Sequence, residues 1–258
     1  MADAIGAAAG LGVFAWYLSA LYVGWRILRV GARRDDAPAR WIGTYLFVAM
    51  GIGSILISIP TARGALGGIA PTPFDRMLVA LALACTVVGN LGILTFTRRV
   101  FRPESAVARA FAVAVGLLLV CGVIGHGLVD RFSWKLSEVS AVLYLSGTVL
   151  SNGWSALESL RYYGLMRKRL RLGLAEPLDA NRFLLWGVGA GATALMLFAT
   201  TLELQMEAVS TPEQIAAVRA VSLPVMSLLG LTSAGSYLFA FFPAGWYVRR
   251  FASARAAR

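Results

Sequence analysis

The stretch ESLRYYGLMRKRLRLGLAEPLDANRFLLW, residues 158–186, decides the fold of this chain. It is the longest hydrophilic interval in the sequence, and it is rich in arginine. Long apolar segments lie on both sides of it, so its charge indicates which side of a membrane the neighbouring segments face. The stretch predicts a basic cytoplasmic loop, residues 161–181, between two membrane-spanning helices.

The composition of the whole chain is typical of a membrane protein. Of its 258 residues 58% are hydrophobic and 14% are charged, whereas soluble domains are about one quarter charged. Apolar runs of about 20 residues recur, and each is long enough to cross a hydrocarbon core of about 30 Å. A net charge of +11 in a soluble protein would suggest nucleic acid, but here the arginines lie at the ends of apolar segments. We therefore expect a lipid bilayer and no nucleic-acid partner.

Seven membrane-spanning helices are predicted. Lipid offers no hydrogen-bond partner to an open backbone, so every span is expected to be helical. The expected architecture is an all-α membrane protein, a seven-transmembrane-helix bundle forming a single domain, with spans at 5–28, 41–60, 76–97, 107–129, 137–160, 182–205 and 219–247. Pro224 and Pro243 lie near the two ends of the last span and predict kinks there.

Basic residues alternate between the predicted connections. The first, third and fifth connections and the C-terminal tail hold most of the 24 Lys and Arg residues. Because basic residues accumulate on the cytoplasmic side, this bias places the N-terminus outside and the C-terminus in the cytoplasm. Aromatic residues beside the basic ends, among them Trp186, are expected at the membrane interface.

The basic stretch is expected to be partly helical. No proline occurs in residues 157–174, and helix-forming residues dominate there. Gly173 is placed to end this helix, Pro177 prevents its continuation, and Asp179 is expected to cap the next helix. Anionic lipid and a cytoplasmic protein partner both fit the pattern. The candidate contacts with either are Arg161, Arg167, Lys168, Arg169 and Arg171.

Two segments carry a resemblance to known proteins. RLRLGLAEPLDANRFLLWG, residues 169–187, and FTRRVFRPESA, residues 96–106, resemble segments of uncharacterised bacterial seven-helix integral membrane proteins. Related seven-helix regions also resemble membrane input modules of bacterial signalling proteins. The resemblance implies a protein of the bacterial cytoplasmic (inner) membrane with a sensory role, and it assigns no role to any residue.

Ionisable side chains near the outer ends of the spans are the candidates for a ligand site, because charge inside a membrane is unfavourable. His126 and Asp130 lie one turn apart at the end of the fourth predicted span. Glu138 opens the fifth span, and Glu203 lies near the end of the sixth. These four residues form an outward-facing pocket if their helices are neighbours. The alternative is a solvated rim with one hydrogen-bonded histidine.

Other polar residues indicate packing, and several chemistries are excluded. Asn90 and Asn152 lie at similar depth and are expected to join helices by hydrogen bonds. A single histidine provides neither paired haem ligands nor a histidine-rich metal site. Both lysines, Lys135 and Lys168, lie in predicted loops, which excludes a retinal Schiff base within a span. No cofactor and no metal are expected.

These features favour a non-enzymatic sensory or signal-coupling module that acts through a cytoplasmic or membrane protein partner. A small-solute transporter is one alternative, although neither an internal repeat nor a charged residue at mid-membrane supports it. An accessory subunit of a membrane complex is the other alternative.

Overall fold

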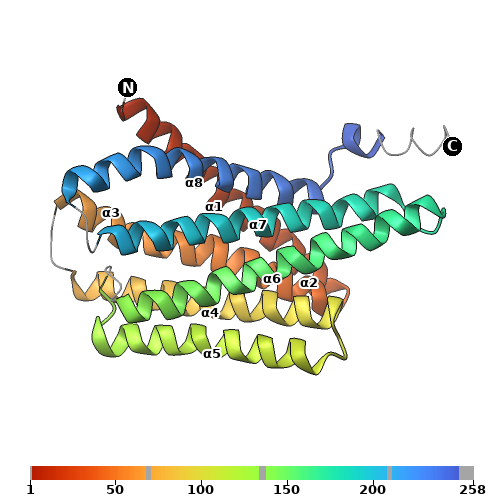
Figure 1. The fold of residues 1–258 in the computed structure, drawn as a ribbon, viewed down its shortest axis with the longest axis horizontal. Helices are drawn as coiled ribbons and strands as arrows, with labels where there is room; N and C mark the ends of the chain where they lie inside the picture. Colours follow the sequence, from red (N-terminus) through yellow and green to blue (C-terminus); the bar gives the residue numbers. More distant parts are fainter. Residues whose placement is uncertain (1, 68–70, 134–137, 208–210, 250–258) are drawn as a thin grey trace.

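The computed structural model describes residues 2–67, 71–133, 138–207 and 211–249 (Figure 1). These residues are almost entirely helical, and no strand occurs among them. The prediction of an all-helical fold is confirmed. The elements are α1 (Ala2–Arg33), α2 (Ala37–Thr44), the π-helix η1 (Tyr45–Gly53), α3 (Ser54–Gly67), α4 (Pro73–Phe101), α5 (Ala106–Val129), α6 (Glu138–Arg171), α7 (Pro177–Glu207) and α8 (Pro212–Phe241).

The described part of the chain forms seven long helical rods, because α2, η1 and α3 follow one another without a break. Five of these rods are long and apolar enough to cross a membrane, namely Ala37–Arg63, Pro73–Phe101, Ala106–Val129, Pro177–Glu203 and Glu213–Phe241. The rods α1 and α6 fall outside this set, so the count of seven spans stays a prediction. These are the features of a multi-pass membrane protein.

The rods pack as a ring. Each rod contacts the next one in the chain, α1 contacts α8, and α4 also contacts α6 across the ring.

Glycines allow some of the closest approaches between rods. A Cβ atom on Gly24 would lie 2.4 Å from the backbone N of Phe47, and one on Gly122 would lie 2.6 Å from that of Tyr144. A side chain at either position would therefore force the two rods apart.

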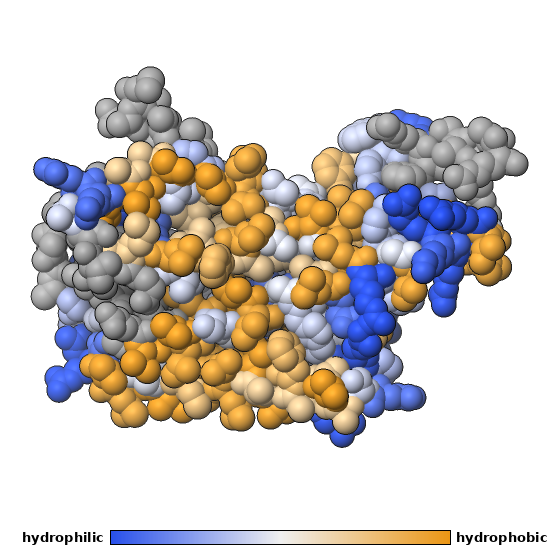
Figure 2. Space-filling view, in the orientation of Figure 1, coloured by the Kyte–Doolittle hydropathy of each residue, from blue (hydrophilic) through white to orange (hydrophobic). Residues whose placement is uncertain are grey.

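The two ends of the bundle differ in charge. The connections at 34–36, 102–105 and 172–176 and the segment 242–249 lie on the same side, which we call the basic end (Figure 1). Figure 2 shows hydrophilic residues at both ends and an apolar belt between them. Exposed leucines such as Leu117, Leu128 and Leu228 contribute to this outer surface. A belt of this kind is suited to contact with lipid.

The second rod differs from the α-helix predicted over residues 41–60. Its helical structure extends from 37 to 67, and Tyr45–Gly53 adopts a π-helix. Backbone hydrogen bonds from i to i+5 are rare and are frequently found at functional sites. Most of the η1 side chains are buried, including Tyr45 and Leu46. No residue pattern in YLFVAMGIG had indicated the change of helix type.

The last predicted span, 219–247, is not one helix. α8 ends at Phe241, and after a break at 242–244 a short helix covers 245–249. Pro243 lies in this break, where it supplies no backbone N–H for a continuing helix. Pro224, in contrast, is accommodated within α8.

In the connection between α6 and α7, one of two sequence predictions agrees with the structure and the other does not. Gly173 has a φ of +70° directly after α6, as expected for a residue that ends a helix. The prediction that Asp179 caps the next helix is wrong, because α7 already begins at Pro177. Proline is favoured in the first turn of a helix. Asp179 therefore lies inside that turn, where it pairs with Arg182 at 3.2 Å.

Candidate functional site

A row of polar side chains runs along the buried face of α6. We call it the polar ladder, and its members are Thr148, Ser151, Asn152, Ser155 and Ser159. All five are almost completely inaccessible to solvent. Spacings of three and four residues place them on one side of the helix, toward the centre of the ring.

The two asparagines connect α6 to other rods. Asn152 accepts a hydrogen bond from the Tyr45 hydroxyl of η1, while its own NH₂ group donates to the Thr148 carbonyl at 2.9 Å. Ser151 donates to the side-chain carbonyl of Asn90 in α4. Since all these groups are buried, their hydrogen bonds replace those that water would otherwise make. The ladder thus binds α6 to the second rod and to α4.

Trp186 of α7 makes the third connection. Its indole Nε1 donates to Ser155 Oγ at 3.0 Å. Its ring lies 5.0 Å from that of Tyr237 in α8 and 5.7 Å from that of Phe96 in α4, centroid to centroid. Trp186 is buried, so its ring faces the interior of the bundle and not the surrounding lipid or water. An indole in the interior needs a partner for its N–H, and Ser155 provides it.

Some buried polar atoms of this interior have no hydrogen-bond partner among the described residues. They are Trp16 Nε1, Thr97 Oγ1, the Ser159 hydroxyl of the ladder and the Tyr237 hydroxyl. The adjacent rods are joined by the hydroxyls of Thr193 and Ser233, which lie 2.8 Å apart. The centre of the bundle is therefore both polar and tightly packed.

At the end opposite to the basic end, His126 joins α5 to α6. We call this group the His126 cluster. His126 Nδ1 lies 2.7 Å from Asp130 Oδ2, and Nε2 lies 2.9 Å from the Ser133 carbonyl oxygen. Ser140 of α6 donates to the same Asp130 oxygen at 2.8 Å. Both ring nitrogens thus face oxygen acceptors, and both contacts are hydrogen bonds only when the imidazole is doubly protonated.

The turn beside the His126 cluster has an unusual backbone. Arg131 and Phe132 have φ values of 50° and 55°, a region that residues other than glycine seldom occupy. The Phe132 ring lies edge-on to the imidazole, with centroids 5.8 Å apart. A Cβ atom on Gly127 would meet Phe132 Cζ at 2.7 Å. The turn is packed directly on His126, so a change at the ring reaches the turn and α6.

The structure does not gather the four predicted pocket residues. His126 and Asp130 lie together, but Glu203 binds Arg219 at 3.0 Å and Ser222 at 3.2 Å, both of α8. The physical reason is the order of the ring, in which α6 lies between α5 and α7. Glu138 begins α6, and its side chain lies outside the described residues.

Beyond the ladder, α6 projects past most of the other rods and turns back into α7 (Figure 1). We call residues 161–182 the basic hairpin. Glu158, at its base, pairs with Arg102 at 2.9 Å and with Arg161 at 3.7 Å. The predicted contact residues are all exposed on the hairpin: Arg161, Arg167, Lys168, Arg169 and Arg171.

Comparisons with protein-family models, with curated proteins and with solved structures find no match to this chain. Within the described ranges no group of three His, Cys, Asp or Glu side chains is arranged to hold a metal ion. What the geometry offers is a row of buried polar side chains on one helix, with a histidine cluster at one end and exposed cations at the other.

Proposed function

We propose that this chain is a non-enzymatic signal-coupling module of the bacterial inner membrane. In this proposal all seven rods cross the bilayer, the N-terminus faces outward, and the basic end faces the cytoplasm. The position of all four basic segments at one end of the bundle supports this orientation, since basic residues accumulate on the cytoplasmic side.

One observation carries the proposal: α6 is a single helix of 34 residues that belongs to all three polar regions. Ser140 binds the His126 cluster, the ladder occupies the middle of the helix, and the basic hairpin begins at its other end. A helix held by directed hydrogen bonds moves as a unit, so a displacement at Ser140 is carried to Arg171. Such a rigid element, biased from one end and read at the other, is what coupling requires.

The His126 cluster is the proposed input end of this device. The imidazole nitrogens contact Asp130 Oδ2 and the Ser133 carbonyl oxygen, so a ligand that displaces the ring would break both contacts. The charged groups of the surrounding turn are Asp130, which contacts the ring, and the exposed Arg131. Displacement of the ring would therefore loosen the contact between the turn at 130–133 and α5, and with it the attachment of Ser140 to Asp130.

At the other end, the basic hairpin is the proposed output. Its exposed cations would bind an acidic surface of a cytoplasmic or membrane protein partner, or anionic lipid. The hairpin base is fixed by aromatic contacts, in which the Tyr162 and Phe183 rings lie 4.6 Å apart and Phe101 packs on Tyr162 at 5.6 Å. Movement of α6 would consequently shift the hairpin as a whole.

The test measures that movement directly. Spin labels at Leu172→Cys, on the exposed tip, and Val107→Cys, on α5, report one distance in liposomes after Cys85 and Cys121 are replaced by alanine. We expect the distance distribution in His126→Ala to differ from that in the unsubstituted background, because the variant loses the ring contacts with Asp130 and Ser133. An unchanged distribution in His126→Ala would refute coupling through α6. Solute uptake by the same liposomes would instead favour a transporter.

A further inference from the structure

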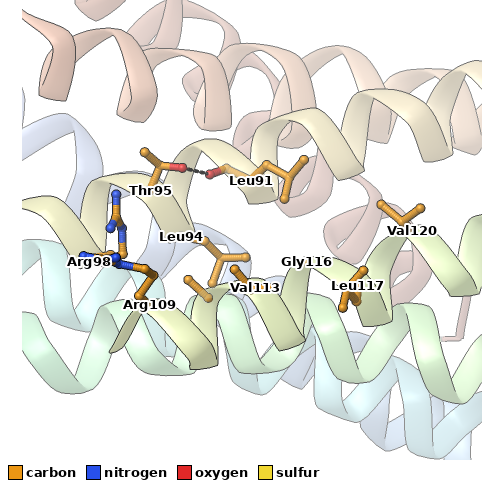
Figure 3. A pocket seen from close by; sticks show the side chains of 10 residues that line it. Leu91, Leu94, Thr95, Arg98, Arg109, Val113, Gly116, Leu117 and Val120 are labelled. Atoms are coloured by element: carbon orange, nitrogen blue, oxygen red, sulfur yellow. Dashed lines mark hydrogen bonds between the residues drawn. The ribbon is translucent and has the colours of Figure 1, made fainter. Parts of the chain in front are cut away.

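A groove runs along the outer side of α4 and α5 (Figure 3). It has a volume of about 450 Å³ and opens away from the centre of the bundle. Its wall is mainly apolar, and the residues used below are Leu91, Leu94, Val113, Gly116, Leu117 and Val120. Neither the His126 cluster nor the polar ladder borders it, so its role is separate from the coupling proposed above.

Gly116 creates the depth of this groove. A Cβ atom at Gly116 would lie 3.1 Å from Leu91 Cδ2, so a larger residue would fill the space between the helices. Val113 and Leu117, one on each side of Gly116, are each 58% exposed and form a ridge of α5 beside it. The result is an open, elongated apolar groove, which we call the channel.

The length of the channel matches one leaflet of a bilayer. From Arg109 to Val120 it follows about three turns of α5, roughly 16 Å at 1.5 Å per residue. Half of a hydrocarbon core of about 30 Å is about 15 Å. An acyl chain that begins at the basic end would thus lie in the channel over its full depth in that leaflet.

Two arginines mark the end of the channel at the basic end. Arg98, in the last turn of α4, and Arg109, in the first turns of α5, lie close together there (Figure 3). Neither forms an ion pair with a carboxylate of the described chain, and the neighbouring Glu104 is exposed. The Thr95 hydroxyl donates a hydrogen bond to the Leu91 carbonyl at 2.7 Å. Two adjacent cations without a protein counter-ion leave an anion site at the mouth of the channel.

We propose that this groove binds one anionic phospholipid of the cytoplasmic leaflet. Its phosphate lies between the guanidinium groups of Arg98 and Arg109, and one acyl chain follows Gly116 toward Val120. Guanidinium groups match the geometry of phosphate oxygens, and basic pockets between helices on the cytoplasmic side recognise anionic headgroups. The apolar channel distinguishes a lipid from a free phosphate, because only the lipid has a chain to fill it.

The experiment is native mass spectrometry of the full chain in detergent with equal amounts of phosphatidylglycerol and phosphatidylcholine. We expect the protein to retain phosphatidylglycerol selectively, with each arginine contributing about fivefold, the equivalent of about 1 kcal/mol per basic residue. Arg98→Gln/Arg109→Gln should lose that preference. The matched control, Arg33→Gln/Arg34→Gln, removes the same charge from exposed positions at the same end and should keep it.

A second variant tests the channel without changing the charge. Val113→Trp adds bulk beside Gly116 at an exposed position, so folding is preserved while lipid retention should fall. Equal loss in the groove and control arginine pairs would overturn the proposal in favour of diffuse charge. Displacement of the lipid by millimolar glycerol phosphate, or unchanged retention in Val113→Trp, would indicate a headgroup site without a chain channel and would also overturn it.

Discussion

The two halves of α6 hold polar residues in opposite ways. Between Thr148 and Ser159 the polar side chains are buried, and most of them have a defined partner on the same helix or another rod. Between Arg161 and Arg171 the basic side chains are exposed, and their charges face solvent or the membrane surface. We therefore expect substitutions in the buried half to lower the stability of the fold and substitutions in the exposed half to leave it nearly unchanged.

The largest expected effect comes from breaking the ladder at Asn152. Asn152→Leu leaves the Tyr45 hydroxyl buried without a partner, which should lower the free energy of unfolding by about 2 kcal/mol. Reversible unfolding in mixed detergent micelles measures this. Tyr45→Phe/Asn152→Leu removes both polar groups and should recover part of the loss. If the double variant loses the sum of the two single effects, the pair does not stabilise the fold.

Trp186→Phe should have an intermediate effect. It keeps an aromatic ring against Tyr237 but removes the N–H that Ser155 accepts, with an expected loss of about 1 kcal/mol in the free energy of unfolding. The same micelle titration applies. Ser155→Ala should add little further loss in the Trp186→Phe background, whereas a full additive loss would show that Ser155 has another role.

At the boundary between the two halves, Glu158→Gln should cost about 0.5 kcal/mol, because Arg102 and Arg161 are both partly solvated and such pairs contribute little. Salt screens a pair of this kind. The difference between the variant and the unsubstituted chain should therefore shrink when unfolding is repeated at 1 M salt. A difference that persists at high salt would assign the effect to packing instead.

The smallest effect on stability is expected on the hairpin. Replacing Arg167, Lys168, Arg169 and Arg171 together by glutamine should change the free energy of unfolding by no more than about 0.5 kcal/mol and leave membrane topology intact. Flotation with anionic vesicles, in contrast, should weaken clearly. If flotation and partner co-purification are both unchanged, the hairpin is only a charged connection.

The helical content and most rod boundaries could be predicted from the sequence, because lipid permits few structures and long apolar runs are unambiguous. Asn90 and Asn152 were also identifiable, since an amide inside a span has few roles other than joining helices. The residues to which they are hydrogen-bonded, Ser151 and Tyr45, could not be identified from the sequence. Tyr45 and Trp186 carry one polar atom on a large apolar body, so hydropathy alone does not tell an interior position from an interfacial one.

The grouping of the acidic residues depended on information that the sequence lacks. Glu203 was expected beside His126 because both lie near the same end of their spans. The structure separates them because α6 intervenes, and the order of rods around a ring is set by packing over the whole bundle. The π-helix at Tyr45–Gly53 is a similar case, since it packs against α1 and α4 and nothing in its residue pattern had indicated it.

The contact between α1 and α8 has a consequence for biosynthesis. These rods are separated by the whole length of the bundle in sequence, yet a Cβ atom on Gly12 would lie 1.9 Å from Ser227 Oγ. In the proposed topology α1 enters the membrane before α8 is made, so the face of α1 that carries Gly12 and Trp16 stays uncovered until α8 arrives. The interface between these two rods can therefore form only late in synthesis, after the rods that lie between them in the sequence.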